Sequence, residues 1–393
     1  MIRLSRRINK TKILLSFSTH MVTDTYASFI VGLIPVLTAK LGLSLFLVSI
    51  LTSVNFISNS LTQPLFGYFS DKYGIRYFLI AGPLVAAIFI SILGIFPAYW
   101  LILVFLFIGN LGVAAIHPPT AATASHVGGS RKGLLNSIVA FGGTIGFSVG
   151  SLIIILIVNK LGLKFTPLAA IPGIIMALVI LKSDPLILQS GAKKFKTGFV
   201  KKIKSLKKAK LGLLLLIIFA SYARDLLISS MLTFMPLYFT EQGVKLLNFG
   251  YIVLVFILFG GIGGLIAGYY SDRLRKRTTV IQIGLIISVP LFYLMFITPL
   301  NISIILFILA GFFITSTLPL CIRVVQDIFP GNVSLASSMV MGVSGGTAAA
   351  TVILIGKIAD NVGMVRTINF ALIIPILASL LLFLFPLVRS KYK

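Results

Sequence analysis

Few ionisable residues lie within the long apolar stretches of this sequence, and their types and spacing suggest proton transfer. Asp24 follows His20 by four residues, which places both side chains on one face of a helix. Burial raises the pKa of a carboxyl group, and a neighbouring imidazolium lowers it. We therefore expect Asp24 to gain and lose a proton near physiological pH. This pair is the leading candidate for a proton site. The alternative is that Asp24 makes a structural hydrogen bond or pairs permanently with a cation.

A second pair of charged residues, Arg224 and Asp225, lies in another apolar stretch. Neighbouring residues of a helix point about 100° apart, so these two side chains need not pair with each other. Arg224 could face a cavity as an anion or counter-ion site, or it could pair with an acid on a neighbouring helix. Asp225 could be a second proton-coupling residue, and a structural role is equally open.

Three further polar residues are candidates for a substrate cavity. His117 precedes Pro118 and Pro119, and because proline removes a backbone donor and can open a helix, we interpret this histidine as a proton relay or a substrate ligand. Arg323 and Asp327 are one helical turn apart. They could form a pair within one helix, contact the substrate or act as an inner gate.

A stripe of amide side chains is also expected in this cavity. Asn55, Asn59 and Gln63 follow one another at intervals of four residues in an apolar helix. They could line the cavity, or they could bond to a neighbouring helix, as amides often do within membrane bundles.

These side chains require elements that hold them within a membrane. Of the 393 residues, 58% are hydrophobic and 11% are charged, whereas soluble domains carry about 25% charged residues. A helix that crosses the hydrocarbon core needs roughly 20 apolar residues. The sequence predicts an all-α integral membrane protein with twelve such helices, at residues 13–38, 44–69, 76–96, 100–125, 133–158, 164–182, 211–239, 246–270, 278–298, 302–328, 334–359 and 365–388.

Lysine and arginine residues predict how these helices are oriented. With both termini in the cytoplasm, 26 of the 34 basic residues fall on the inner side, six on the outer side and two within helices. This bias is typical of cytoplasmic loops. The net charge of +26 would indicate nucleic-acid binding in a soluble chain, but here it lies in short clusters between apolar stretches. We therefore expect contact with anionic lipids and no nucleic acid, in the plasma (inner) membrane of a prokaryote.

The sequence repeats itself, which indicates two copies of one six-helix unit. A shift of 201 residues superposes Asp24 on Asp225 and residues 67–72 on residues 268–273. Because six is even, both copies enter the membrane in the same direction, and a substrate site is expected between them near the midplane. The predicted domains are an N-terminal bundle at 1–190, a basic cytoplasmic linker at 191–210 and a C-terminal bundle at 211–393.

One motif resembles that of a known family. The run from Gly67 to Arg76, in the predicted cytoplasmic loop after the second helix, resembles the signature loop of the major facilitator superfamily, and a weaker copy follows the eighth helix. The resemblance implies a transporter of two six-helix bundles. It also implies a conformational latch at the inner face, in which Asp71 accepts hydrogen bonds from the amino end of a neighbouring helix. The predicted latch residues are Gly67, Asp71, Lys72, Gly74, Arg76, Asp272 and Arg273.

Other segments resemble the fosmidomycin-resistance branch of that superfamily, and this resemblance implies proton-driven export. They are residues 20–26, 63–67, 116–118 and 233–238, together with Arg224. Two patterns of the superfamily's drug exporters are not matched. Ile108 stands where an arginine is usual in the fourth helix, and the glycine pattern of the fifth helix is met only in part, by Gly142, Gly146, Phe147, Gly150 and Ser151. The general drug-antiporter mechanism therefore does not carry over residue by residue.

The expected function is secondary active transport by alternating access. We expect proton-coupled export (antiport) of a small drug-like or anionic organic molecule. A proton-coupled importer or facilitator of a small anionic metabolite is the alternative, and a membrane enzyme or lipid flippase is a third hypothesis. The sequence has no phosphate-binding glycine loop after a strand and no cluster of metal ligands at close spacing. We therefore expect no cofactor, no metal and no enzymatic activity, with protons and anionic lipids as partners of a monomer.

Overall fold

The computed structural model describes residues 2–127, 132–183, 208–274, 277–329 and 339–390. Within these ranges the regular structure is entirely helical, and twelve helical segments are long and apolar enough to cross a membrane. The predicted all-α class and the twelve predicted spans are confirmed. The protein is therefore a multi-pass membrane protein.

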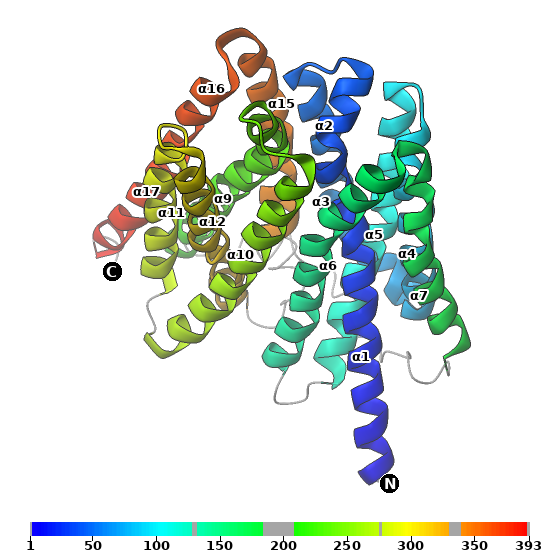
Figure 1. The fold of residues 1–393 in the computed structure, drawn as a ribbon. Helices are drawn as coiled ribbons and strands as arrows, with labels where there is room; N and C mark the ends of the chain where they lie inside the picture. Colours follow the sequence, from blue (N-terminus) through cyan, green and yellow to red (C-terminus); the bar gives the residue numbers. More distant parts are fainter. Residues whose placement is uncertain (1, 128–131, 184–207, 275–276, 330–338, 391–393) are drawn as a thin grey trace. The chain divides into compact units, whose positions relative to one another are not determined.

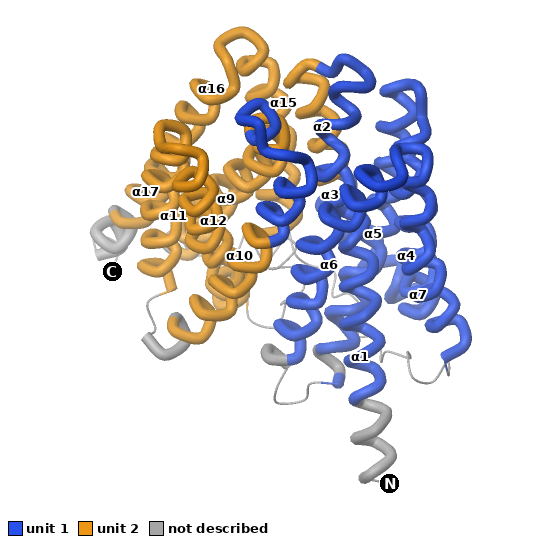
Figure 2. Tube along the Cα trace, viewed as in Figure 1, with its two compact units in different colours: residues 1–43, 58–195, 239–254 blue, residues 44–57, 196–238, 255–393 orange. Residues whose placement is uncertain are grey.

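The chain forms two compact units (Figure 2). Unit 1 comprises Met1–Leu43, Ser58–Phe195 and Phe239–Leu254. Unit 2 comprises Ser44–Ile57, Lys196–Tyr238 and Val255–Lys393.

Figure 1 labels most of the helices in chain order. The first half of the chain contains α1 (Ile2–Ala27), α2 (Phe29–Leu41), α3 (Leu45–Tyr73), α4 (Ile75–Ser91), the 3-10 turn η1 (Ile92–Ile95), α5 (Tyr99–Val127), α6 (Lys132–Leu161), the 3-10 segment η3 (Leu163–Ala170) and α7 (Ile171–Lys182). The second half contains α9 (Lys208–Glu241), α10 (Leu246–Leu274), α11 (Arg277–Leu294), α12 (Leu300–Thr315), α13 (Thr317–Ile328), the π-helical turn η5 (Met339–Val343), α15 (Ser344–Val362), α16 (Met364–Ala371) and α17 (Ile373–Ser390).

The units differ from the two predicted bundles in two described segments, and most of the predicted linker at 191–210 lies outside the described residues. Residues 44–57 lie in unit 2 and residues 239–254 lie in unit 1. The start of α3 packs within unit 2 because it lies directly against α15. The Ser53 hydroxyl donates a hydrogen bond to the carbonyl oxygen of Ala349 (2.5 Å), and Gly356 is so close to α3 that a Cβ there would meet a side-chain oxygen at 2.2 Å.

The first and fifth spans pack closely in unit 1 because glycines line the face of α6 that meets α1. A Cβ at Gly146 would lie 1.9 Å from the carbonyl oxygen of Met21, and a Cβ at Gly150 would lie 2.0 Å from that of Thr25. Only glycine allows the two backbones to approach this closely. The face of α1 that carries the candidate proton site is therefore held against α6.

The signature motif lies at a helix end and not in the predicted loop. Helix α3 continues to Tyr73, so that Asp71 and Lys72 belong to its last turn. Nothing in this run interrupts a helix before Gly74, whose φ of 99° is readily adopted only by glycine. Helix α10 likewise ends at Leu274, beyond the weaker copy of the motif.

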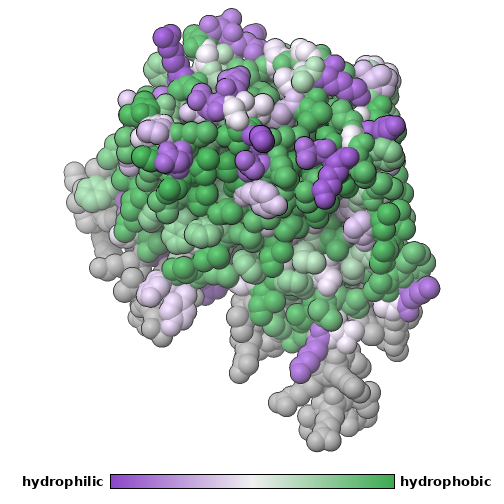
Figure 3. Space-filling view, in the orientation of Figure 1, coloured by the Kyte–Doolittle hydropathy of each residue, from purple (hydrophilic) through white to green (hydrophobic). Residues whose placement is uncertain are grey.

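Hydrophobic side chains dominate the visible surface in Figure 3. Trp100, Phe370 and Phe383 each expose more than 60% of their surface. Large apolar side chains exposed in such number would favour association in water, but they match the hydrocarbon chains of a bilayer.

Candidate functional site

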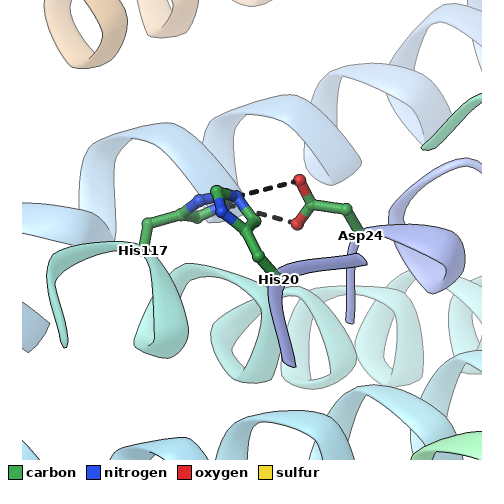
Figure 4. A group of neighbouring side chains, drawn as sticks. All are labelled: His20, Asp24 and His117. Atoms are coloured by element: carbon green, nitrogen blue, oxygen red, sulfur yellow. Dashed lines mark ion pairs between the residues drawn. The ribbon is translucent and has the colours of Figure 1, made fainter. Parts of the chain in front are cut away.

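Three ionisable side chains meet in unit 1. The Nε2 atom of His20 lies 3.3 Å from Oδ2 of Asp24, and Nε2 of His117 lies 3.6 Å from Oδ1 of the same carboxylate (Figure 4). The two imidazole rings meet edge to face with centroids 4.8 Å apart. The expected contact between His20 and Asp24 is thus present, and His117 completes the cluster from another helix.

The positions of these residues on their helices bring the three side chains together. His20 and Asp24 are one turn apart on α1, and His117 extends from α5 immediately before Pro118 and Pro119. The two prolines lack N–H groups, so the carbonyl groups of Ala114 and Ala115 have no helical donor. His117 therefore directly precedes two positions at which the backbone hydrogen bonding of α5 is interrupted.

Burial makes this cluster chemically unusual. His20 is only 9% exposed, and the side chains of Asp24 and His117 are 14% and 16% exposed. Among the described residues, Oδ1 of Asp24, Nδ1 of His20 and Nε2 of His117 have no hydrogen-bond partner. Buried polar atoms are usually satisfied, so these three atoms are suited to exchange a proton or to contact a bound molecule. Their ligand-type atoms lie within 4.8 Å of one another, close enough to hold a metal ion as well.

Arg224 and Asp225 form a second buried group, in unit 2. Their side chains make an ion pair, although their positions on α9 did not require one. The other carboxylate oxygen of Asp225 accepts a hydrogen bond from the Ser344 hydroxyl (2.8 Å). Ser344 begins α15 directly after the π-helical turn η5. The Nε atom of Arg224, a residue that is 5% exposed, has no partner among the described residues.

Arg323 and Asp327 are paired near the end of α13, as one of the open hypotheses stated. The Nε atom of Arg323 lies 3.5 Å from Oδ1 of Asp327, and the other oxygen of Asp327 pairs with Arg277. About half of each side chain of the Arg323 pair is exposed. The group is therefore less buried than the other two. Arg277 was not among the predicted residues, because it lies on α11 and no sequence spacing links it to Asp327.

The three amide residues of α3 differ in their surroundings. Asn55 is 1% exposed and lies in the segment that packs within unit 2. Gln63 donates from Nε2 to Oδ1 of Asn59 (3.4 Å), so these two amides bond along their own helix. That these amides contact a substrate remains a prediction.

Of the predicted latch residues, Asp71, Lys72 and Arg76 lie at the ends of α3 and α4. Asp71 and Lys72 are exposed, and the Lys72 ammonium lies 5.0 Å from the ring centre of Tyr73. Arg76 donates to the carbonyl oxygen of Leu181 (2.7 Å), which ties the start of α4 to the end of α7. Gly67 contacts α5, where a Cβ would lie 3.6 Å from Pro118. The side chains of Asp272 and Arg273 lie outside the described residues, and the latch remains a prediction.

Comparison with known proteins adds the evolutionary context. A family model described as Major Facilitator Superfamily matches residues 15–339. The fosmidomycin resistance protein of Escherichia coli (strain K12) is 24% identical over 372 residues, which cover 93% of this chain and 90% of that protein. The uncharacterized MFS-type transporter YfnC of Bacillus subtilis (strain 168) is 28% identical over 375 residues, with the same coverage of 93% and 90%.

Solved structures show the same fold at low sequence identity. A variant of the nucleoside transporter NupG superposes with a TM-score of 0.75 at 15% identity and covers 97% of this chain and 100% of its own. A bacterial homologue of the human lysosomal transporter Spinster, in an inward-facing and unoccupied conformation, superposes with a TM-score of 0.73 at 13% identity and covers 96% and 97%. The fold class expected from the signature motif is confirmed.

Proposed function

Because the chain belongs to the Major Facilitator Superfamily, we propose that it is a proton-coupled exporter, an antiporter that moves a small drug-like or anionic organic molecule out of the cell as protons enter. Members of this superfamily are transporters and not enzymes. The observation that carries the proposal is the buried cluster of His20, Asp24 and His117, in which two imidazoles flank one carboxylate.

The cluster suits proton coupling because its charge and its contacts change together. A carboxylate within a membrane bundle is tolerated when it has a cationic or hydrogen-bonding partner. With Asp24 ionised, the imidazoles of His20 and His117 supply that partnership. When Asp24 takes up a proton, the negative charge that faces His20 of α1 and His117 of α5 disappears. A single proton therefore alters the contact between two helices of unit 1, which provides a physical link between protonation and conformation.

The similarity to a fosmidomycin resistance protein supports export as the direction. The test is a proteoliposome screen in which candidate solutes are added and the internal pH is recorded with a trapped dye. We expect an active solute to drive proton movement in the wild type. Asp24→Asn should abolish this movement while it leaves solute counterflow intact, because binding and exchange do not require the proton.

Glu241→Gln is the matched control, because this acid is exposed at the end of α9. It should leave proton movement unchanged. A chelator present throughout ensures that metal ions are not the coupled species. Gradient-driven transport by Asp24→Asn at the wild-type rate would reject Asp24 as the coupling residue.

A proton-coupled importer or facilitator of a small anionic metabolite is the second candidate. The unpartnered Nε atom of the buried Arg224 favours it, since a guanidinium N–H is a strong donor to anions. The same liposomes separate the two functions. Accumulation of the solute together with inward proton movement would support import, whereas solute exit as protons enter supports antiport.

We also propose that both termini face the cytoplasm of a bacterium, as the distribution of basic residues indicates. The only cysteine, Cys321, is buried and gives little background in a labelling experiment. A cysteine introduced at Lys40 should react with an impermeant maleimide in intact cells, and one introduced at Lys182 should react only after lysis. The reverse pattern would invert the topology.

A further inference from the structure

Helix α6 contacts the proton site through a residue that has no side chain. A Cβ at Gly143 would lie 2.5 Å from Oδ2 of Asp24 and 2.7 Å from Nε2 of His20. These are the two atoms that form the shortest contact of the cluster, at 3.3 Å. Any side chain at position 143 would therefore occupy the space in which the carboxylate and the imidazole meet.

The other glycines on this face of α6 have different neighbours. A Cβ at Gly142 would meet the ring and the carbonyl oxygen of Phe17, at 2.8 and 2.9 Å, and the three atoms nearest to a Cβ at Gly146 are backbone atoms of Met21. Close packing of α1 and α6 thus involves several glycines. Contact with the ionisable groups is made by Gly143 alone among them.

We propose that Gly143 is a positioning residue that holds the carboxylate of Asp24 against the imidazole of His20. The inference rests on the proposed role of Asp24 in proton coupling. The physical reason is that α6 forms a flat wall at this point. A Cβ at this position would overlap both the carboxylate and the imidazole, so the contact between them depends on the absence of a side chain at Gly143.

The groups that face Asp24 define what a change at position 143 would do. His20 faces it from α1 itself, His117 faces it from α5, and α6 presents Gly143. Helices α4 and α7 also pack on α1, but the Arg76 guanidinium of α4 is bound to the carbonyl groups at the end of α7. Among the described residues the two imidazoles are therefore the titratable groups that act on this carboxylate.

The experiment measures protonation of Asp24 without knowledge of the substrate. Full-length protein in liposomes is treated with dicyclohexylcarbodiimide, an apolar reagent that modifies protonated carboxyl groups, and labelling of the Asp24 peptide is followed by mass spectrometry from pH 5 to 9. Asp24→Asn identifies the signal. In Gly143→Ala we expect the labelling midpoint to rise by about one pH unit, because the displaced carboxylate loses a partner that favours its charged form.

Gly142→Ala is the matched control, since it adds the same methyl group to the same helix without touching the carboxylate. It should lower the melting temperature about as much as Gly143→Ala does but leave the labelling midpoint unchanged. His20→Ala provides the second test and also makes room if Gly143→Ala folds poorly. In that background the added methyl group at position 143 should shift the midpoint by much less, as expected for two residues that act through one contact.

The possible failures are distinct. If Asp24 of the wild type shows no pH-dependent labelling and no solute drives proton movement, the proton site itself is wrong. If Asp24 titrates but Gly143→Ala and Gly142→Ala have the same midpoint, only the positioning role of Gly143 is wrong. An equal shift from Gly143→Ala with and without His20 would also overturn it.

Discussion

The carboxylate of Asp360 caps the first turn of α3. It accepts hydrogen bonds from the backbone N–H groups of Leu45 (2.8 Å) and Phe46 (3.1 Å). These are among the donors that a helix cannot satisfy internally, and the positive end of the helix dipole favours an anion there. Asp360 lies on α15, in the second sequence repeat, and α3 lies in the first. The contact therefore accounts for part of the packing of residues 44–57 within unit 2.

Removal of this cap should destabilise the protein. Asp360→Asn eliminates the negative charge and places an amide where two backbone donors need acceptors. We expect a loss of about 1 kcal/mol, seen as a melting temperature a few degrees lower in detergent. Asn361→Ala is the control, because the side chain of Asn361 donates to the carbonyl oxygen of Lys357 in its own helix. Equal melting temperatures for the two variants would show that the cap contributes nothing.

The pairing of Arg224 with Asp225 predicts strong coupling between two mutations. Arg224→Gln leaves a buried carboxylate without its cation, and Asp225→Asn leaves a buried guanidinium without its anion. Each should destabilise the fold by about 3 kcal/mol. The double variant should recover most of that loss, since neither charge remains. The melting temperatures of the wild type, the two single variants and the double variant measure this coupling. Additive losses in the double variant would contradict it.

The same variants decide the role of Asp225 in transport. If the double variant folds and still couples solute to proton movement in liposomes, Asp225 is a structural partner of Arg224. Loss of coupling in a well-folded double variant would instead make Asp225 a second proton site.

Some features of the fold could be predicted because they depend on local physics. Each membrane-spanning helix requires its own apolar stretch, so the twelve spans could be identified separately from the sequence. His20 and Asp24 could be matched because one helical turn separates them. His117 could be recognised as unusual from the prolines that follow it, but its contact with Asp24 depends on how α5 packs against α1, which no spacing in the sequence encodes.

Other features required three-dimensional packing. Gly143 looks like any small residue in a glycine-rich helix until its distance from Asp24 is known. Arg224 and Asp225 point in different directions at their Cβ atoms, yet the long arginine side chain reaches its neighbour. Ser344 contacts Asp225 from the first turn of α15, after an irregular turn that the sequence pattern does not reveal.

Two glycine substitutions should differ in their effect on stability, because one glycine lies in the close contact of α1 with α6 and the other faces open space. A Cβ at Gly146 would overlap the carbonyl oxygen of Met21, so Gly146→Ala must displace α1 and should cost about 1–3 kcal/mol. A Cβ at Gly268 of α10 would meet nothing within 4 Å. Gly268→Ala should therefore be neutral or stabilise the protein by about 0.5 kcal/mol through helix propensity. A thermal-shift measurement checks both signs, and a neutral Gly146→Ala would contradict the close approach.

The hydroxyl group of Tyr26 joins α1 to the sixth span and should contribute measurably to stability. It donates to the carbonyl oxygen of Ala169 (3.0 Å) and accepts from the backbone N–H of Gly173 (2.7 Å), and Tyr26 is only 1% exposed. Tyr26→Phe preserves the ring but removes both of these buried hydrogen bonds, at an expected loss of about 1–3 kcal/mol. Tyr251→Phe removes the same oxygen from a half-exposed ring and should have little effect. Melting temperatures within one degree of each other for these two variants would show that the buried hydroxyl does not hold the helices together.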